Sequence, residues 1–79
     1  METFTLKTDF IALNKLLKSI GWAETGGHAH ELIDTGVVTI NGTVETQRRK
    51  KVRADMVVAC EGNVVTIVND ELLIVNDEL

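Results

Sequence analysis

The sequence predicts one small α+β domain, in which two helices pack on a mostly antiparallel sheet of about four to five short strands. Two segments have apolar residues at helical spacing and end at a glycine, and four others are short, apolar and bounded by turn residues. A chain of 79 residues with 44% apolar residues can build one modest core. We expect the domain to span residues 1–68, with an extension over residues 69–79.

The first strand and the first helix are predicted from side-chain spacing. Residues 2–6 alternate polar and apolar side chains, which is typical of a half-buried strand. A helix capped at residue 8 or 9 is expected to continue to about Ile20 and to end at Gly21. Trp22 is expected to fill the core between two helices rather than to stack on a base. The apolar stripe of this first helix consists of Phe10, Leu13, Leu16, Leu17 and Ile20.

A second, shorter helix is predicted from an N-cap at Thr25 to about Thr35, with Gly36 ending it. Gly26 and Gly27 in its first turn are each about 1 kcal/mol worse than Ala as helix formers. Two reasons fit them equally well: another backbone segment approaches closely, or a phosphate approaches bare helix N–H groups. The inward-facing residues of this second helix are Ala29, Leu32 and Ile33.

A hairpin is predicted after the second helix, because the strand 37–40 is followed by Asn41-Gly42. A strict two-residue loop would place Val44 opposite residue 39. A loop one residue longer places Val44 opposite Ile40, and we expect this register because it gathers apolar side chains on one face. Two further strands, at residues 56–60 and 64–68, flank a turn at residues 61–63.

The charge of the chain is unevenly distributed. The net charge is −4, yet five of the eight basic residues lie between positions 48 and 53, a span without acids. If this segment is extended, both of its faces carry charge, so we expect an exposed edge or loop. Such an edge can simply prevent aggregation between strands. It can also attract a polyanion, because local potential acts within about a Debye length of 8–10 Å.

Catalytic and metal-binding chemistry find little support in the sequence. His28 and His30 are two residues apart on a helix and therefore point in different directions. Cys60 lies in an apolar strand, where a thiol is normally inert. We expect no enzyme activity, no catalytic or metal-binding residues, no cofactor and no small-molecule substrate. No apolar run reaches the roughly 20 residues that span a membrane, and we expect a cytoplasmic monomer.

The C-terminal residues repeat themselves, since residues 67–72 recur as residues 74–79. Two copies are too few for a solenoid. We interpret the second copy as a local, acidic duplication that adds an optional strand or tail, and we expect deletion of residues 70–79 to leave folding intact.

A nucleic-acid surface is the functional interpretation that the basic run favours. Charge neutralisation of the phosphate backbone supplies most of the non-specific affinity for nucleic acids. The chain has three aromatic residues, too few to stack the successive bases of a single strand. This favours a protein that recognises the shape and the phosphates of a duplex. Lys18, His28 and His30 would extend the positive surface along the helices.

The order of these elements resembles a known family. The segments Leu16-Leu17-Lys18, Gly21-Trp22, Thr25-Gly26-Gly27-His28-Ala29, Gly36-Val37-Val38-Thr39-Ile40-Asn41-Gly42 and the basic run with Val52 and Asp55 carry the resemblance. Over about residues 4–68, the chain is similar to the RNA-binding domain named after small-subunit ribosomal protein S-four. That domain contains two helices and a hairpin, the alpha-L motif. The chain looks most like small stand-alone bacterial members of the YbcJ/YaaA type.

The resemblance implies binding of structured RNA, ribosomal or transfer-RNA-like, by the second helix and the adjoining hairpin. Many members carry arginines in the first turns of the second helix, where this chain has Gly26, Gly27 and His30. Because these arginines are absent, we expect the basic run to be the main part of the RNA-binding site. The family's Gly before the turn Asp is replaced here by Ala54. The RNA-binding residues we expect are Lys18, Gly26, Gly27, His28, His30, Asn41, Arg48, Arg49, Lys50, Lys51 and Arg53.

Two other functions remain as alternatives to RNA binding. A protein-interaction module would use the basic edge to dock an acidic partner. A small enzyme would need a concave site around His28 or Cys60, and a structure that separates these groups would exclude it.

Overall fold

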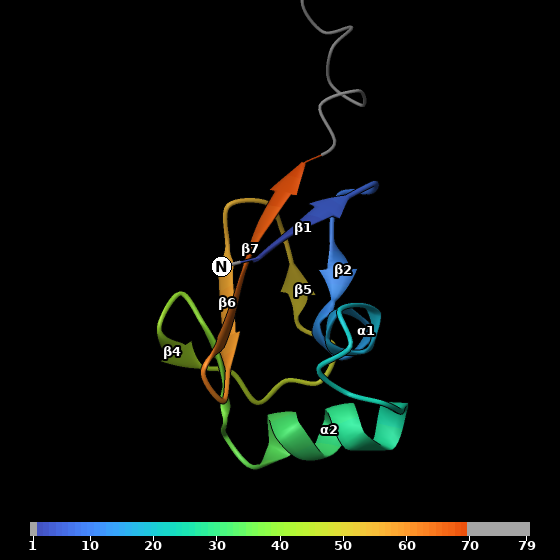
Figure 1. The fold of residues 1–79 in the computed structure, drawn as a ribbon, viewed down its shortest axis with the longest axis vertical. Helices are drawn as coiled ribbons and strands as arrows, with labels where there is room; N and C mark the ends of the chain where they lie inside the picture. Colours follow the sequence, from blue (N-terminus) through green and yellow to red (C-terminus); the bar gives the residue numbers. More distant parts are fainter. Residues whose placement is uncertain (1, 70–79) are drawn as a thin grey trace, which may run out of the picture.

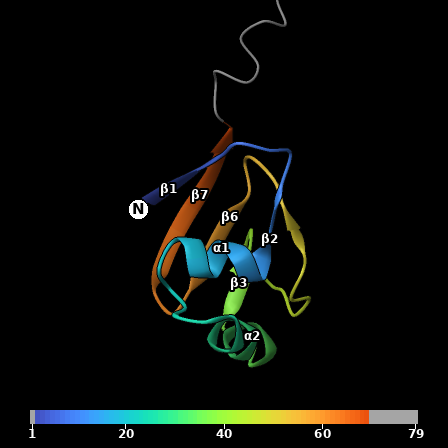
Figure 2. The same cartoon turned by 90° about the vertical axis from the view of Figure 1, so that its right-hand side faces the viewer.

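The computed structural model describes residues 2–69, in which two helices pack against one face of a twisted sheet (Figures 1 and 2). Figure 2 shows α1 in front of the sheet and α2 below α1. The α+β class predicted from the sequence is confirmed. The elements are β1 (Glu2–Leu6), β2 (Ile11–Ala12), α1 (Leu13–Ser19), α2 (Gly26–Asp34), β3 (Val38–Ile40), β4 (Thr43–Val44), β5 (Lys51–Val52), β6 (Val57–Cys60) and β7 (Asn63–Asn69).

The larger sheet has five strands in the order β1-β7-β6-β3-β4, and β2 pairs with β5 in a separate two-stranded sheet. All pairs are antiparallel except β1 with β7, so the sheet is mostly antiparallel as predicted. The parallel pair joins the N-terminal strand to the last strand that the structure describes. The two strands at the ends of the described chain are therefore paired with each other in the sheet.

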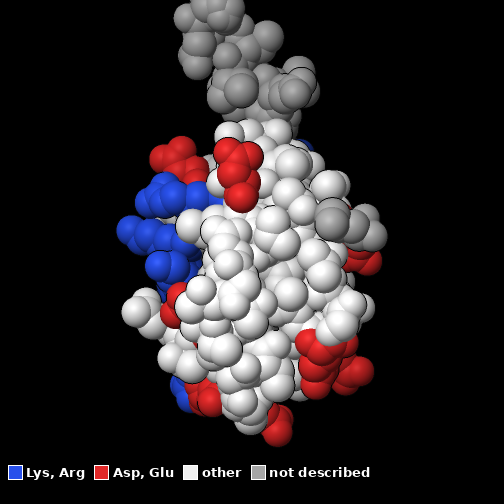
Figure 3. Space-filling model, turned by 90° about the vertical axis from the view of Figure 1, so that its left-hand side faces the viewer, with Lys and Arg blue, Asp and Glu red and all other residues white. Residues whose placement is uncertain are grey.

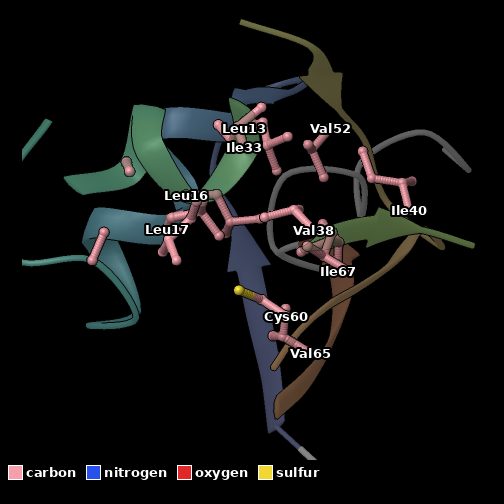
Figure 4. Close-up of a cluster of buried hydrophobic side chains, with 14 of the residues drawn as sticks. Leu13, Leu16, Leu17, Ile33, Val38, Ile40, Val52, Cys60, Val65 and Ile67 are labelled. Atoms are coloured by element: carbon pink, nitrogen blue, oxygen red, sulfur yellow. The ribbon is translucent and has the colours of Figure 1, made fainter. Parts of the chain in front are cut away.

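The core lies between the inner face of the sheet and the two helices (Figure 4). Val65 and Ile67 on β7 are fully buried, and so is Val58 on β6. Their neighbours along each strand are more exposed, as the two-residue period of a strand requires. The helices contribute Leu13, Leu16, Leu17, Ala29, Leu32 and Ile33 to this core.

The first helix begins later than the sequence predicted. Residues 11 and 12 are extended and pair with β5, and α1 begins at Leu13. The backbone N–H groups of Leu13 and Asn14 donate to the carbonyl oxygens of Lys50 and Arg48, at 2.9 and 3.0 Å. A distant segment thus satisfies donors that a side-chain cap normally satisfies, and no side chain caps α1. Phe10 therefore lies outside the helix.

The predicted register of the first hairpin is also wrong. Val44 pairs with Thr39, and Ile40 pairs with Thr43, which is the strict two-residue loop. Asn41 and Gly42 have φ angles of 53° and 86°, as the type I′ turn requires at both central positions. β4 is a short edge strand whose two residues are both exposed, so burial of apolar side chains does not fix its register. The backbone geometry of the turn sets the register instead. Val44 is consequently 53% exposed.

The predictions for the other helix ends and turns are largely confirmed. Thr25 caps α2, since its hydroxyl oxygen accepts the N–H of His28 at 3.0 Å. Gly21 and Gly36 follow the two helices with φ angles of 83° and 81°. Trp22 is partly buried against the core. The turn between β6 and β7 is one residue shorter than expected, because Asn63 already pairs with residue 60.

The predicted C-terminal extension lies largely outside the described residues. β7 includes residue 69, so the sheet extends one residue past the predicted domain boundary. Within residues 2–69, no helix is both long enough and apolar enough to cross a membrane.

Candidate nucleic-acid interface

The basic run lies against the N-terminal end of α1. Two of its carbonyl groups accept the first N–H groups of that helix, and its last part forms β5. The backbone is thus anchored, and Val52 is fully buried, while the flanking side chains of Lys51 and Arg53 are exposed. Arg48 and Arg49 are exposed in a turn, and Lys50 is half-buried. The predicted exposed edge is confirmed for all of these side chains except Lys50.

Arg48 forms an ion pair with Asp34 at the end of α2. Its Nη2 lies 2.6 Å from Oδ2 of Asp34, and its Nε donates to Oδ1 at 3.1 Å. The hydrogen bond from Arg48 lowers the pKa of Asp34, and the same bond raises the pKa of Arg48. The two-pronged geometry fixes the basic run to α2 and compensates the charge of Arg48. Arg48 is therefore less available to a phosphate than its neighbours are.

An exposed aromatic ring lies at the centre of the remaining cations. Phe10 is 37% exposed, with Nζ of Lys51 at 4.9 Å from the ring centroid and Cζ of Arg53 at 5.6 Å. Both distances are within the range of cation–π interactions. Beside the ring is a hollow of about 420 Å³ whose lining includes Lys15 and Arg49. We call these five residues, Phe10, Lys15, Arg49, Lys51 and Arg53, the basic surface.

The space-filling view shows how unevenly the charge is spread. In Figure 3, Lys and Arg side chains gather along one edge of the molecule, whereas the centre of that view carries few charged groups. A polyanion that approaches this edge therefore meets concentrated positive potential, although the whole chain has a net charge of −4.

Asn14, at the start of α1, connects one face of α2 with the basic run. The side-chain oxygen of Asn14 accepts the N–H of Lys15, which directs its amide nitrogen to Nε2 of His30 at 3.1 Å. Gly26 and Gly27 precede His30 by four and three residues, so they lie on the same face of the helix. Asn14 thus links His30 to the start of α1, and Arg48 links the basic run to the C-terminal end of α2, while the first turn of α2 lies one turn before His30.

The two glycines at the start of α2 have no close protein neighbour. A Cβ built on Gly26 would meet nothing within 4 Å, and one on Gly27 would meet only Oγ1 of Thr25, at 3.9 Å. Within residues 2–69, no other backbone segment approaches the side-chain positions of these glycines, so the first of the two reasons considered for them finds no support there. Their N–H groups lie in the first turn, where a helix offers no internal acceptor.

The structure places three other predicted residues apart from this surface or in different roles. His28 is on another face of α2, where its Nδ1 accepts the N–H of Glu24 at 3.2 Å. The side-chain oxygen of Asn41 accepts the N–H of Val57 at 2.9 Å and so stabilises the hairpin. Lys18 is exposed one helical turn beyond Asn14, at the far end of α1 from the basic run.

The candidate reactive groups are separated as well. Cys60 is 3% exposed in the core, and burial raises the pKa of its thiol, with a further contribution from Glu61. His28 is exposed on α2, so the two do not share a surface. Among residues 2–69, no three His, Cys, Asp or Glu side chains are grouped so that they could hold a metal ion.

Comparison with known proteins identifies the family of this fold. The family model described as the S4 domain matches residues 4–68, which is most of the chain. The chain belongs to the S4 domain family. Two curated relatives are the YbcJ proteins of Escherichia coli (strain K12) and Shigella flexneri. Each is 41% identical to this S4 domain over 69 residues, which cover 86% of this chain and 99% of the relative.

A solved structure supports the same assignment. The solution structure of YbcJ from E. coli matches this S4 domain with a TM-score of 0.68 and 40% identity, covering 86% of this chain and 87% of that one. It is described as revealing an alfaL motif involved in RNA binding. The resemblance and the fold expected from the sequence are therefore confirmed.

Sequence reasoning missed three residues of the interface. Phe10 fits the apolar spacing of a helix, so nothing local indicated that it would be exposed beside cations. Nothing near Lys15 in the sequence indicated that it would line a hollow together with Arg49. Asn14 carried no signal, because its importance lies in contacts with residues 30 and 48, both distant in sequence.

Proposed function

We propose that this S4 domain binds structured RNA, ribosomal or transfer-RNA-like, and that it does so without catalysis. Phosphates would be held by the basic surface and by the first turn of α2. The similarity to YbcJ supports the proposal, because the alfaL motif in that structure is described as involved in RNA binding. The proposal assigns no catalytic role to Cys60, which is buried.

The observation that carries the proposal is the arrangement of the basic surface. Arg49, Lys51 and Arg53 are exposed on one anchored segment, and Lys15 reaches the same hollow from α1. Anchoring the backbone lowers the entropy lost when these side chains bind in a fixed array. Lys50 is half-buried, and Arg48 is paired with an acid, so both contribute less to phosphate binding.

The start of α2 supplies a second contact in this proposal. Backbone N–H groups at a helix N-terminus, together with the helix dipole, attract anions. Gly26 and Gly27 leave open space around these groups. His30 lies one turn further along the same helix face, toward Asn14 and the basic run. A phosphate backbone that crosses from α2 to β5 would contact both sites.

The test is the salt dependence of binding to a labelled RNA hairpin. The logarithm of affinity should fall linearly with the logarithm of salt concentration, and Arg49→Ala should reduce that slope by about one. Lys18→Ala is the matched control, since it removes a positive charge at the far end of α1 from the basic run and should leave the slope nearly unchanged. Affinity that ignores salt, or equal slopes for the two variants, would refute the proposed contacts.

An acidic protein partner would use the same cations, so it must be tested separately. A length-matched acidic peptide is titrated in parallel with the RNA hairpin. Under the proposal the hairpin binds more tightly, because the cations are spaced along a surface that also offers helix N–H groups. Tighter binding of the peptide would favour a protein-interaction module instead.

A further inference from the structure

The most unusual feature of the basic surface is the exposure of Phe10. Besides Val44 at the edge of the sheet, it is the one large apolar side chain classed as exposed among residues 2–69. Phe4 and Trp22, the other aromatic residues, are partly buried against the core. A single exposed apolar side chain is common on protein surfaces, so the exposure of Phe10 is informative here only because two cations contact the ring and a hollow lies beside it.

The pairing of β2 with β5 places Phe10 beside two cations. Ile11 lies opposite Val52, and continuing that antiparallel register places Phe10 opposite Arg53. Lys51, two residues earlier on β5, lies diagonally across and is also within reach of the ring. Phe10 itself precedes β2 by one residue, so the pairing at Ile11 places its ring beside both cations.

The hollow beside the ring is large enough for one nucleotide. Its volume of about 420 Å³ falls within the range of small-ligand pockets, about 300–1,000 Å³. The apolar side is formed by Phe10 and Ala12, while Lys15, Arg49 and Lys51 supply positive charge around it. An aromatic face next to cations matches the chemistry of a nucleotide, which joins a flat base to a phosphate.

We propose that this hollow binds one unpaired nucleotide of the RNA, with its base stacked on Phe10 and its phosphates held by Lys15, Arg49 and Lys51. This inference rests on the proposed function and adds a substrate class to it. The preferred RNA is a duplex interrupted by a bulged or flanking nucleotide rather than a fully paired stem. The cations that now contact the ring would then turn toward the phosphates.

The experiment compares two labelled RNA hairpins that differ by one unpaired adenosine in the stem. Stacking of a base on an aromatic side chain is worth about 1–3 kcal/mol, so the bulged hairpin should bind about 5- to 150-fold more tightly. Phe10→Leu should lower the affinity for the bulged hairpin to that for the paired hairpin. Phe10→Trp should retain the preference. Phe4→Leu is the matched control, because it removes another aromatic ring from outside the hollow.

Each outcome separates this inference from the proposed function. Equal, salt-dependent binding of both hairpins would overturn the nucleotide site and leave the phosphate contacts standing. A preference that persists in Phe10→Leu would also overturn it. If neither hairpin binds, both proposals fail. Should Phe10→Leu not fold, the wild-type comparison and Phe10→Trp still decide, since equal affinities in the wild type refute the stacked base.

Discussion

Replacing Gly27 by Ala should make the protein more stable and a weaker RNA binder. A Cβ at this position would meet only Oγ1 of Thr25 at 3.9 Å, an ordinary van der Waals contact, so no steric penalty is expected. Ala is a better helix former than Gly by up to about 1 kcal/mol. For a domain of this size, 1 kcal/mol corresponds to a rise in Tm of about 4–8 °C.

The same methyl group would obstruct a phosphate at the first turn of α2. If one charge-assisted hydrogen bond worth about 1.5 kcal/mol is lost, affinity for an RNA hairpin falls about tenfold. Thermal unfolding followed by circular dichroism gives the stability, and fluorescence anisotropy gives the affinity. Both are measured on the same protein preparation, so a folding defect cannot be mistaken for a binding defect.

Gly42→Ala is the control for this reasoning. A Cβ on Gly42 would meet no atom of the described residues within 4 Å, but the φ of 86° strains any other residue by about 1–2 kcal/mol. This variant should therefore lower Tm and leave RNA affinity unchanged. A Gly27→Ala protein that is more stable and binds RNA normally would refute a phosphate at this helix start. One with a lower Tm would show that the fold itself needs the glycine.

Three further predictions concern the hairpin and the ion pair. Val44→Thr should change the free energy of unfolding by less than about 0.5 kcal/mol, whereas Val58→Thr, in the core, should lower it by about 1–3 kcal/mol. Urea denaturation measures both values, and similar losses of unfolding free energy in the two variants would contradict the observed register. Asn41→Ala should lose about 2 kcal/mol, from a hydrogen bond and a strained φ, without changing RNA affinity measured on folded protein. The pair with Arg48 lowers the pKa of Asp34, so its stabilisation is present above the ordinary carboxyl pKa of 3.8 and is lost as pH falls through the lowered value. The stability difference between wild type and Asp34→Asn should therefore vanish in acid, and a difference independent of pH would argue against the pair.

Features encoded within a few neighbouring residues were predicted well from the sequence. The Thr25 cap and the helix ends at Gly21 and Gly36 depend on backbone groups one turn away. The alternation of polar and apolar side chains over residues 2–6 predicted the half-buried strand β1. Each of these signals is local, so no knowledge of the rest of the chain is needed.

Errors arose where a distant segment satisfied a local requirement. The sequence predicted a helix that starts near residue 9, because Phe10 continues its apolar stripe. In the structure, carbonyl groups of Arg48 and Lys50 accept the first N–H groups of α1, which lets the helix begin at Leu13. The hairpin register was mispredicted for a different reason: the turn backbone outweighed the apolar pattern on a short edge strand.

The sequence by itself determined that this chain is an α+β domain with a concentrated basic run, and its motifs indicated the family. Only the tertiary structure decided which cations are exposed around a common hollow, since Arg48 pairs with Asp34 while Lys15 joins Arg49 and Lys51. It also decided that Phe10 lies among them. The physical reason is that these contacts join residues distant in sequence, 14 positions apart for Arg48 and Asp34 and about 40 for β2 and β5, and no spacing within one segment records which partner it will meet.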